Sequence, residues 1–251
     1  MIRSLDSFLM IQAIVFDLGN TLLRQDNLDW PKLEKAGFLN HLSIFKKREL
    51  GINLNGWSDL FYRLYEPQKK IAEKTLLEIS ISSIFNAMTE FYRIPKDLNL
   101  SIMVRNFFQP LINARLLFND ASAALQHLKE REIRLAVISN THMPGILSME
   151  VLERLNIRQY FEFAFFSSDF GWRKPHPIMF ESAVNHLQLK PNQIMYVGDQ
   201  PDKDVAGAGA LGIKTVWINR DQIKSKKAGA KPDFTITALS ELESLIKKTK
   251  R

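Results

Sequence analysis

Residues 11–21 have the sequence IQAIVFDLGNT, in which a short apolar run ends in a polar turn. The first six residues are rich in β-branched and aromatic side chains, a composition typical of a buried strand. The next five, DLGNT, contain Asp, Gly and Asn, which favour turns. We therefore predict a buried strand that leads into a loop beginning at Asp17.

Strand and helix patterns alternate again after about residue 110. The further predicted strands are RLAVISN (134–140), FEFAFF (161–166), QIMYVGD (193–199) and KTVWIN (214–219). Segments with helical spacing lie at about 121–132, 145–156, 177–187, 204–210 and 241–248. This alternation predicts an α/β fold, a doubly wound (Rossmann-like) parallel sheet with helices on both faces.

The stretch from residue 29 to residue 108 has a different pattern. Its apolar side chains follow helical spacing, as at Trp57, Leu60, Phe61, Leu64 and Tyr65. It contains no convincing buried strand. We therefore expect an all-helical domain of residues 29–108, inserted into an α/β core domain of residues 1–28 and 109–251.

The composition excludes several classes of site and protein. The 251 residues include no cysteine, so disulfides, thiolate metal sites and a cysteine nucleophile are ruled out. No apolar run reaches the length of about 20 residues that a membrane span needs. The N-terminal segment has no small-residue cleavage site. We expect a cytoplasmic protein with no membrane partner.

The formal net charge of +7 is a sign that could indicate nucleic-acid binding. The basic residues cluster in short runs within segments that we expect to be exposed, at 46–48, 224–231 and 247–251. Surfaces that bind single-stranded nucleic acid interleave such residues with aromatic side chains, and these runs do not. We expect no nucleic-acid partner.

Polar side chains stand at or near the ends of four predicted strands. Asp17, Ser139 with Asn140, and Asp199 each follow a strand directly, and Lys174 lies beyond a fourth. In a doubly wound sheet, ligands bind beyond the carboxyl ends of the strands. We therefore expect these side chains to face one crevice.

The sequence resembles the haloacid dehalogenase superfamily over nearly its whole length. The matching segments, in chain order, are VFDLGNTLL (15–23), AVISNTH (136–142), WRKPHPIMFESAV (172–184) and YVGDQPDKDVAGAGALGI (196–213). The last segment is the most specific, because Gly-Asp, four residues, Asp and a helix of small residues rarely recur by chance. The resemblance implies that the helical insertion is a cap domain.

The resemblance also implies a role for each strand-end residue. Asp17 would be the nucleophile that forms an aspartyl-phosphate, which water then hydrolyses. Lys174 would neutralise Asp17 and the phosphoryl oxygens, and Ser139 would hold a non-bridging oxygen. Asn140 would contribute to substrate binding, and Thr21 would support the nucleophile loop at the substrate site.

A Mg²⁺ site is a further implication of the resemblance. Its ligands would be Asp17, the backbone carbonyl of Gly19, and Asp199, with Asp204 completing the site or orienting its waters. These are oxygen donors, which Mg²⁺ prefers. Asp202 is an alternative to Asp204, although its spacing fits less well.

The chain departs from the family pattern at Gly19. Phosphatases of the family have a second Asp there, which protonates the leaving group and then deprotonates the attacking water. General acid–base catalysis is typically worth about 10²–10⁴-fold, so we expect slow hydrolysis of alkyl phosphates and a preference for acyl or aryl phosphates. The candidate substitutes are His142, His176, Asp26 and Asp29, each of which could equally be a structural residue, a helix cap or an exposed side chain.

We interpret the chain as a Mg²⁺-dependent phosphatase that acts on a small phosphorylated metabolite, as a monomer or homodimer. Two alternatives stay open. An enzyme with the same nucleophile could cleave a carbon–halogen or carbon–phosphorus bond. A catalytically weak protein could instead bind phosphate or a partner and act as a regulator, and Gly19 is the residue that motivates this alternative.

Overall fold

The computed structural model describes residues 11–222 and 230–249. Several of the basic residues that we identified in the sequence lie outside these ranges, namely Lys224, Lys226, Lys227, Lys250 and Arg251. The side chains of Lys247 and Lys248 are likewise not described.

A six-stranded parallel sheet forms the centre of the core, in the order β3-β2-β1-β4-β5-β6. The strands are β1 (Ala13–Phe16), β2 (Arg134–Ser139), β3 (Phe161–Phe166), β4 (Ile194–Gly198), β5 (Lys214–Ile218) and β6 (Phe234–Ile236). Phe16 at the end of β1 lies beside Val137 of β2 and Val197 of β4. The carboxyl ends of the three central strands therefore meet at one edge. The predicted α/β fold class is confirmed, although β6 was not predicted, because three residues are too short a run to show a pattern.

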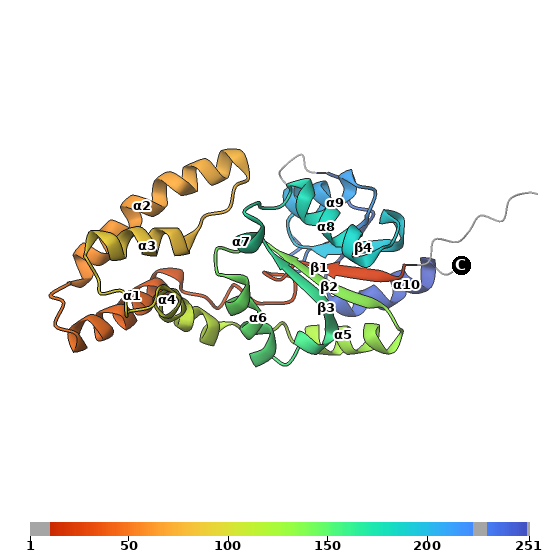
Figure 1. Ribbon diagram of the computed structural model, residues 1–251. Coiled ribbons are helices and arrows are strands. Elements are labelled where there is room, and N and C mark those ends of the chain that lie inside the picture. Colours follow the sequence, from red (N-terminus) through yellow and green to blue (C-terminus); the bar gives the residue numbers. More distant parts are fainter. Residues whose placement is uncertain (1–10, 223–229, 250–251) are drawn as a thin grey trace, which may run out of the picture.

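Helices cover both faces of this sheet (Figure 1). They are α5 (Ala121–Glu130), α6 (Gly145–Arg154), α7 (Ser167–Phe170), α8 (Pro177–Leu187), α9 (Ala206–Ala210) and α10 (Leu242–Thr249). Ala13 and Val15 of β1 pack in a cluster with residues of α8 and α9. Ile14 and Phe16 pack in another cluster with residues of α5, α6 and α10. This alternation along β1 is what a strand buried on both faces requires.

Four helices follow β1 and lie beyond one edge of the sheet (Figure 1). They are α1 (Trp30–Lys47), α2 (Leu54–Thr75), α3 (Ile81–Phe91) and α4 (Leu100–Ala114). A short polar side chain accepts a hydrogen bond from a backbone N–H of the first turn in each case, at Asp29, Asn53, Ser80 and Asn99. Such caps fix where a helix begins.

The helices pack around an aromatic cluster that includes Trp57, Phe61, Phe85 and Phe107. His41 is completely buried among them. Its Nδ1 accepts a hydrogen bond from Trp57 Nε1 at 3.0 Å, and its Nε2 lies 2.7 Å from the carbonyl oxygen of Met103. Burial lowers the pKa of His41 to about 4, so this ring is a neutral structural element.

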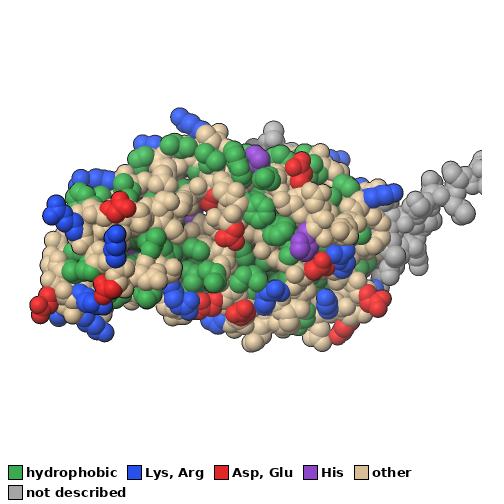
Figure 2. Space-filling model, in the orientation of Figure 1, with side chains coloured by type: hydrophobic (Ala, Val, Ile, Leu, Met, Phe, Trp, Pro, Cys, Tyr) green, Lys and Arg blue, Asp and Glu red, His purple; other side chains and the backbone are tan. Residues whose placement is uncertain are grey.

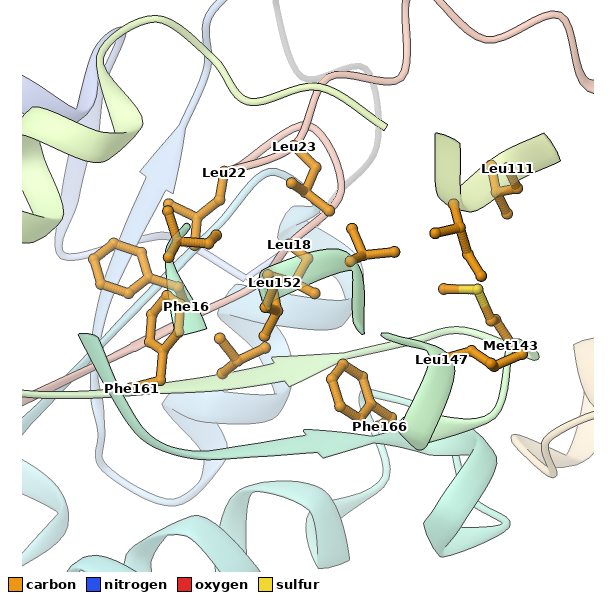
Figure 3. Close-up of a cluster of buried hydrophobic side chains, with 14 of the residues drawn as sticks. Phe16, Leu18, Leu22, Leu23, Leu111, Met143, Leu147, Leu152, Phe161 and Phe166 are labelled. Carbon is orange, nitrogen blue, oxygen red and sulfur yellow. The ribbon is translucent and has the colours of Figure 1, made fainter. Parts of the chain in front are cut away.

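One hydrophobic cluster joins the sheet to these helices (Figure 3). It runs from Phe16 and Phe166 on the sheet, through Leu22 and Leu23 of the loop after β1, to Leu111 of α4. The loop that begins at Asp17 is therefore held between two packed layers. This burial limits the freedom of the loop backbone.

A second contact joins the α2–α3 connection to the loop before Lys174. The backbone N–H of Glu78 donates to the carbonyl of Gly171 at 2.9 Å, and that of Arg173 donates to Leu76 at 2.8 Å. The Glu78 carboxylate is almost fully buried beside Arg173 and His142. The helical segment thus contacts the part of the chain that forms the sheet at two places, through Leu111 and through residues 76–78.

Within residues 11–222 and 230–249, no helix has both the length and the apolar character to cross a bilayer. Figure 2 shows basic and acidic side chains interspersed over the face that it presents.

Candidate active site

Asp17 lies where β1 ends and is buried, with the residue as a whole 6% exposed. Its Oδ2 accepts a hydrogen bond from Thr21 Oγ1 at 3.3 Å, and its Oδ1 accepts one from Lys174 Nζ at 2.7 Å. Thr21 is fully buried, so its hydroxyl holds the Asp17 carboxylate in one orientation. The turn between them is closed by the backbone N–H of Thr21, which donates to Leu18. Local turn geometry thus orients the Asp17 carboxylate toward Lys174.

Lys174 is 3% exposed and its ammonium group lies among four oxygen atoms. They belong to Asp17 and Asp204, each at 2.7 Å, to the hydroxyl of Tyr196 at 2.9 Å and to the carbonyl of Ile138 at 3.1 Å. Burial alone would lower the pKa of Lys174, but the charges of Asp17 and Asp204 hold it well above its usual range. Lys174 is therefore a fixed positive charge against the Asp17 carboxylate.

Asn140 holds the backbone of Lys174 in place. Its Nδ2 donates to the Lys174 carbonyl at 3.1 Å, and its Oδ1 accepts from the Lys174 N–H at 2.8 Å. Ser139, the last residue of β2, is buried. Both residues line the cavity above Asp17. The amide of Asn140 is engaged with the Lys174 backbone, which makes Asn140 a positioning residue for this lysine.

Three carboxylates gather at the carboxyl ends of β1 and β4. Oxygen atoms of Asp17, Asp199 and Asp204 all lie within 4.8 Å of one another. Asp204 belongs to a π-helical turn, Pro201–Val205, and its Oδ2 accepts a hydrogen bond from the Gln200 N–H at 2.9 Å. Asp202, in the same turn, is exposed and lies outside this group. The turn therefore directs Asp204 inward.

The electrostatics of this acidic group fit a bound cation. Burial raises the pKa of Asp17 to about 6 in spite of Lys174, and burial raises the pKa of Asp199 to about 7. Oδ1 of Asp199 is buried and has no hydrogen-bond partner among the described residues. The charges of Lys174 and of Arg115, which lines the same cavity, do not balance three carboxylates. A divalent cation that prefers oxygen ligands would balance the remaining negative charge, and the unpaired Oδ1 of Asp199 could bind it.

Gly19 lines the same cavity. A Cβ atom at this position would overlap the side-chain amide of Gln25. Gln25 therefore occupies the space into which a side chain at position 19 would extend. The sequence held no signal for this, because Gln25 lies in an irregular loop without a motif.

Tyr196 and Arg115 are two further residues of the site that the sequence analysis missed. Tyr196 is 1% exposed and its hydroxyl contacts Lys174, Asp204 and Ile138. A signal for it existed, since a tyrosine inside a buried strand needs a partner for its hydroxyl. Arg115 follows α4 directly and lines the cavity with Asp17 and Lys174.

Most of the candidate substitutes for a general acid have other contacts. His176 stacks on Trp172 and accepts a hydrogen bond from the Ile178 N–H at the start of α8. Asp29 caps α1, and Asp26 forms an exposed ion pair with Arg24. His142 lines a second cavity and lies 3.5 Å from Glu78. None of these four lines the cavity above Asp17.

The parallel sheet, with a strand-end Asp in contact with a buried Lys, is the arrangement that the sequence resemblance implied. The model of the haloacid dehalogenase-like hydrolase family matches residues 11–212. The chain belongs to this family.

The chain is also similar to individual members. It is 35% identical over 127 residues to a glyceraldehyde 3-phosphate phosphatase of Methanocaldococcus jannaschii. The aligned residues make up 51% of this chain and 55% of the relative. The chain thus matches about half the length of that enzyme. It is 24% identical to a ribulose-1,5-bisphosphate 5-phosphatase of Halopiger xanaduensis, over 94% of this chain and all of the relative.

A solved structure shares the fold over most of the chain. The 2-haloacid dehalogenase of Pseudomonas syringae superposes with a TM-score of 0.70 at 23% identity, covering 95% of this chain and 99% of the other. At this identity the similarity concerns the fold alone.

Proposed function

We propose that the protein is a Mg²⁺-dependent phosphatase that hydrolyses small phosphorylated metabolites through an aspartyl-phosphate on Asp17. The observation that carries this proposal is the 2.7 Å contact between Asp17 and the buried Lys174, beside two further carboxylates. Similarity to a glyceraldehyde 3-phosphate phosphatase and a ribulose-1,5-bisphosphate 5-phosphatase supports it.

The reaction would proceed in two steps at one carboxylate. An oxygen of Asp17 attacks phosphorus, the bond from phosphorus to the leaving oxygen breaks, and the leaving group departs as its anion. Water then attacks the phosphorus of the aspartyl-phosphate and loses a proton to solvent, which breaks the bond to the Asp17 oxygen, restores the carboxylate and releases phosphate. Lys174 offsets the negative charge that accumulates on Asp17 and the phosphoryl oxygens, and Ser139 donates to one of those oxygens. When bound by Asp17, Asp199 and the Gly19 carbonyl, Mg²⁺ supplies the remaining positive charge, with Asp204 holding it directly or through water.

Position 19 offers no side chain that could protonate the leaving group. Gly19 has no side chain, and the Gln25 amide that fills its space can donate a hydrogen bond but cannot transfer a proton. The enzyme would therefore depend on leaving groups that depart without protonation.

We also propose that residues 29–108 act as a cap domain on a core of residues 1–28 and 109–251. The cavity that adjoins the one at Asp17 is lined on one side by residues of the insertion, such as Leu33 and Phe61, and on the other by Asn140 and Thr141 of the core. A closed cap excludes water from the reacting centre, which protects the first step from competing hydrolysis.

Phosphate release across alkyl, aryl and acyl phosphates tests the proposed reaction. We expect turnover of acetyl phosphate and 4-nitrophenyl phosphate to exceed that of glycerol phosphates by about 10²-fold or more, because the alkoxide leaving group of a glycerol phosphate needs a general acid. Addition of EDTA should abolish all three activities, and Mg²⁺ should restore them. Release from none of them in the presence of Mg²⁺ would contradict the proposal and favour a regulator.

Halide release from 2-haloacids distinguishes the dehalogenase alternative. That reaction needs no metal, so Asp199 and Asp204, which lie beside Asp17, would have no metal to bind in it. We expect no halide release. EDTA-insensitive halide release would contradict the proposed function.

Mg²⁺ binding should depend on pH through Asp17 and Asp199. Their pKa values are raised from 3.8 to about 6 and about 7, so in the metal-free protein these two groups make the folded state less stable as pH rises across that window. Mg²⁺ offsets this effect once they are ionised. We expect Mg²⁺ to raise the melting temperature clearly at pH 7.5 and much less at pH 5.5.

A comparison with and without Mg²⁺ at each pH isolates these two groups. His41, with its pKa lowered to about 4, has the opposite pH effect on stability, but its buried ring lies among the helices, so it contributes equally to both melting curves. Asp199→Asn should remove the Mg²⁺-dependent shift. A shift of the same size at both pH values would show that neither carboxylate binds the cation.

A further inference from the structure

Two cavities meet at Arg115. The first is lined by Asp17 and Lys174. The second lies against the helices α1 to α4. They share five lining residues: Gln25, Arg115, Asn140, Thr141 and Met143. Arg115 is the basic side chain on this shared wall, so a molecule reaching from Asp17 into the second cavity passes it.

Arg115 is half-buried, and one nitrogen of its guanidinium lacks a hydrogen-bond acceptor among the described residues. Its Nη1 is buried and makes no hydrogen bond to any described residue. Other arginines show the usual arrangement: Arg105 donates two hydrogen bonds to Glu150, and Arg134 donates two to Glu162. A buried donor without an acceptor costs free energy. An incoming ligand with an acceptor oxygen would remove that cost.

Arg115 carries its charge at neutral pH. Burial lowers its pKa to about 10, which is still well above neutrality, and the charge of Asp17 raises it. The ring of Trp30 lies 5.4 Å from its guanidinium carbon. No carboxylate of the described residues forms an ion pair with it. The charge is therefore available to a ligand.

The remaining wall of the second cavity is mostly apolar. It includes Leu33, Phe61, Phe107 and Phe108. The acid on this wall is Glu34, whose Oε2 accepts a hydrogen bond from Tyr62 at 2.6 Å. A carbon skeleton can pack against such a wall, and Arg115, which both cavities share, can bind an anionic group on that skeleton.

We propose that Arg115 is a specificity-determining residue, which binds a second anionic group on the alcohol part of the substrate. The substrate class is then a phosphate monoester whose leaving group bears a carboxylate or another phosphate. Both anions present two acceptor oxygens to a planar guanidinium, which explains an arginine here rather than a lysine. This inference rests on the proposed phosphatase function.

Matched substrates test the proposal. The pairs are carboxyalkyl and carboxyphenyl phosphates, each compared with its neutral carboxamide, and alkanediol bisphosphates compared with the hydroxyalkyl monophosphates. We expect wild-type kcat/KM to favour the anionic member by about 10–100-fold, the range of a buried charged hydrogen bond. A larger preference in the carboxylate pairs or in the bisphosphate pairs identifies the natural anion.

Substitution of Arg115 separates recognition from structural support. Arg115→Met should lower kcat/KM for the anionic members by about 10–100-fold and leave the neutral members almost unchanged, while Arg115→Lys should retain part of the preference. Arg105→Met removes the same charge from an exposed ion pair outside both cavities, so it should leave the preference intact. Equal losses for anionic and neutral members in Arg115→Met would overturn the proposal.

Binding of non-hydrolysable phosphonates makes the proposal testable without turnover. We expect calorimetry with Mg²⁺ present to show about tenfold or more tighter binding of a carboxyalkyl phosphonate than of its carboxamide by wild type, and no difference in Arg115→Met. Absence of phosphate release together with this selectivity would refute the phosphatase and retain the anion site. Absence of selectivity would refute the anion site.

Discussion

Asp17→Asn should reduce phosphate release from every substrate by about 10⁴-fold or more, the size of loss seen when a catalytic nucleophile is removed. An amide nitrogen and a neutral carbonyl oxygen attack phosphorus far less readily than a carboxylate. The same change weakens the cation site, since Asp17 is one of its three carboxylates. The measurement is single-turnover phosphate release with saturating Mg²⁺.

Asp202→Asn is the matched control for this variant. It removes the same charge from an exposed side chain near the site but outside the group of three carboxylates, so activity should stay within about twofold of wild type. Both proteins should show cooperative thermal unfolding. Full activity in a folded Asp17→Asn protein would remove Asp17 as the nucleophile and with it the proposed mechanism.

Gly19→Asp should raise turnover of alkyl phosphates, by up to about 10²–10⁴-fold, because it supplies the missing general acid. The backbone at Gly19 is not left-handed, so an Asp can adopt it. The obstacle is the Gln25 amide, which a Cβ atom at position 19 would overlap. Gln25 is a flexible side chain, and we expect Gly19→Asp combined with Gln25→Ala to show the larger gain.

Three comparisons make this result interpretable. Gln25→Ala alone should not raise alkyl phosphate turnover, since it adds no acid. Acyl phosphate turnover should change little in the double variant, because its leaving group needs no proton. If the double variant folds and binds Mg²⁺ but hydrolyses alkyl phosphates no faster than wild type, position 19 does not face the leaving group.

The elements of the sheet were predictable from the sequence because their signal is local. The runs at β1 to β5 are short, apolar and β-branched or aromatic, and each is bounded by turn or helix residues. β6 has only the three residues Phe234–Ile236, too few for a pattern to develop. The grouping of Asp17, Lys174 and Asp199 could be anticipated as well, because strands that run in parallel end at one edge.

The surroundings of these residues were decided by tertiary structure alone. Gln25 fills the space beside Gly19. Lys174 donates hydrogen bonds to both Tyr196 and Asp17. Arg115 lines two cavities. Each of these relations depends on where a loop or helix is packed against a distant part of the chain. Residue patterns report the spacing within one strand or helix. Which side chains line one cavity depends on how several helices, strands and loops pack together, and no single segment of the sequence encodes that packing.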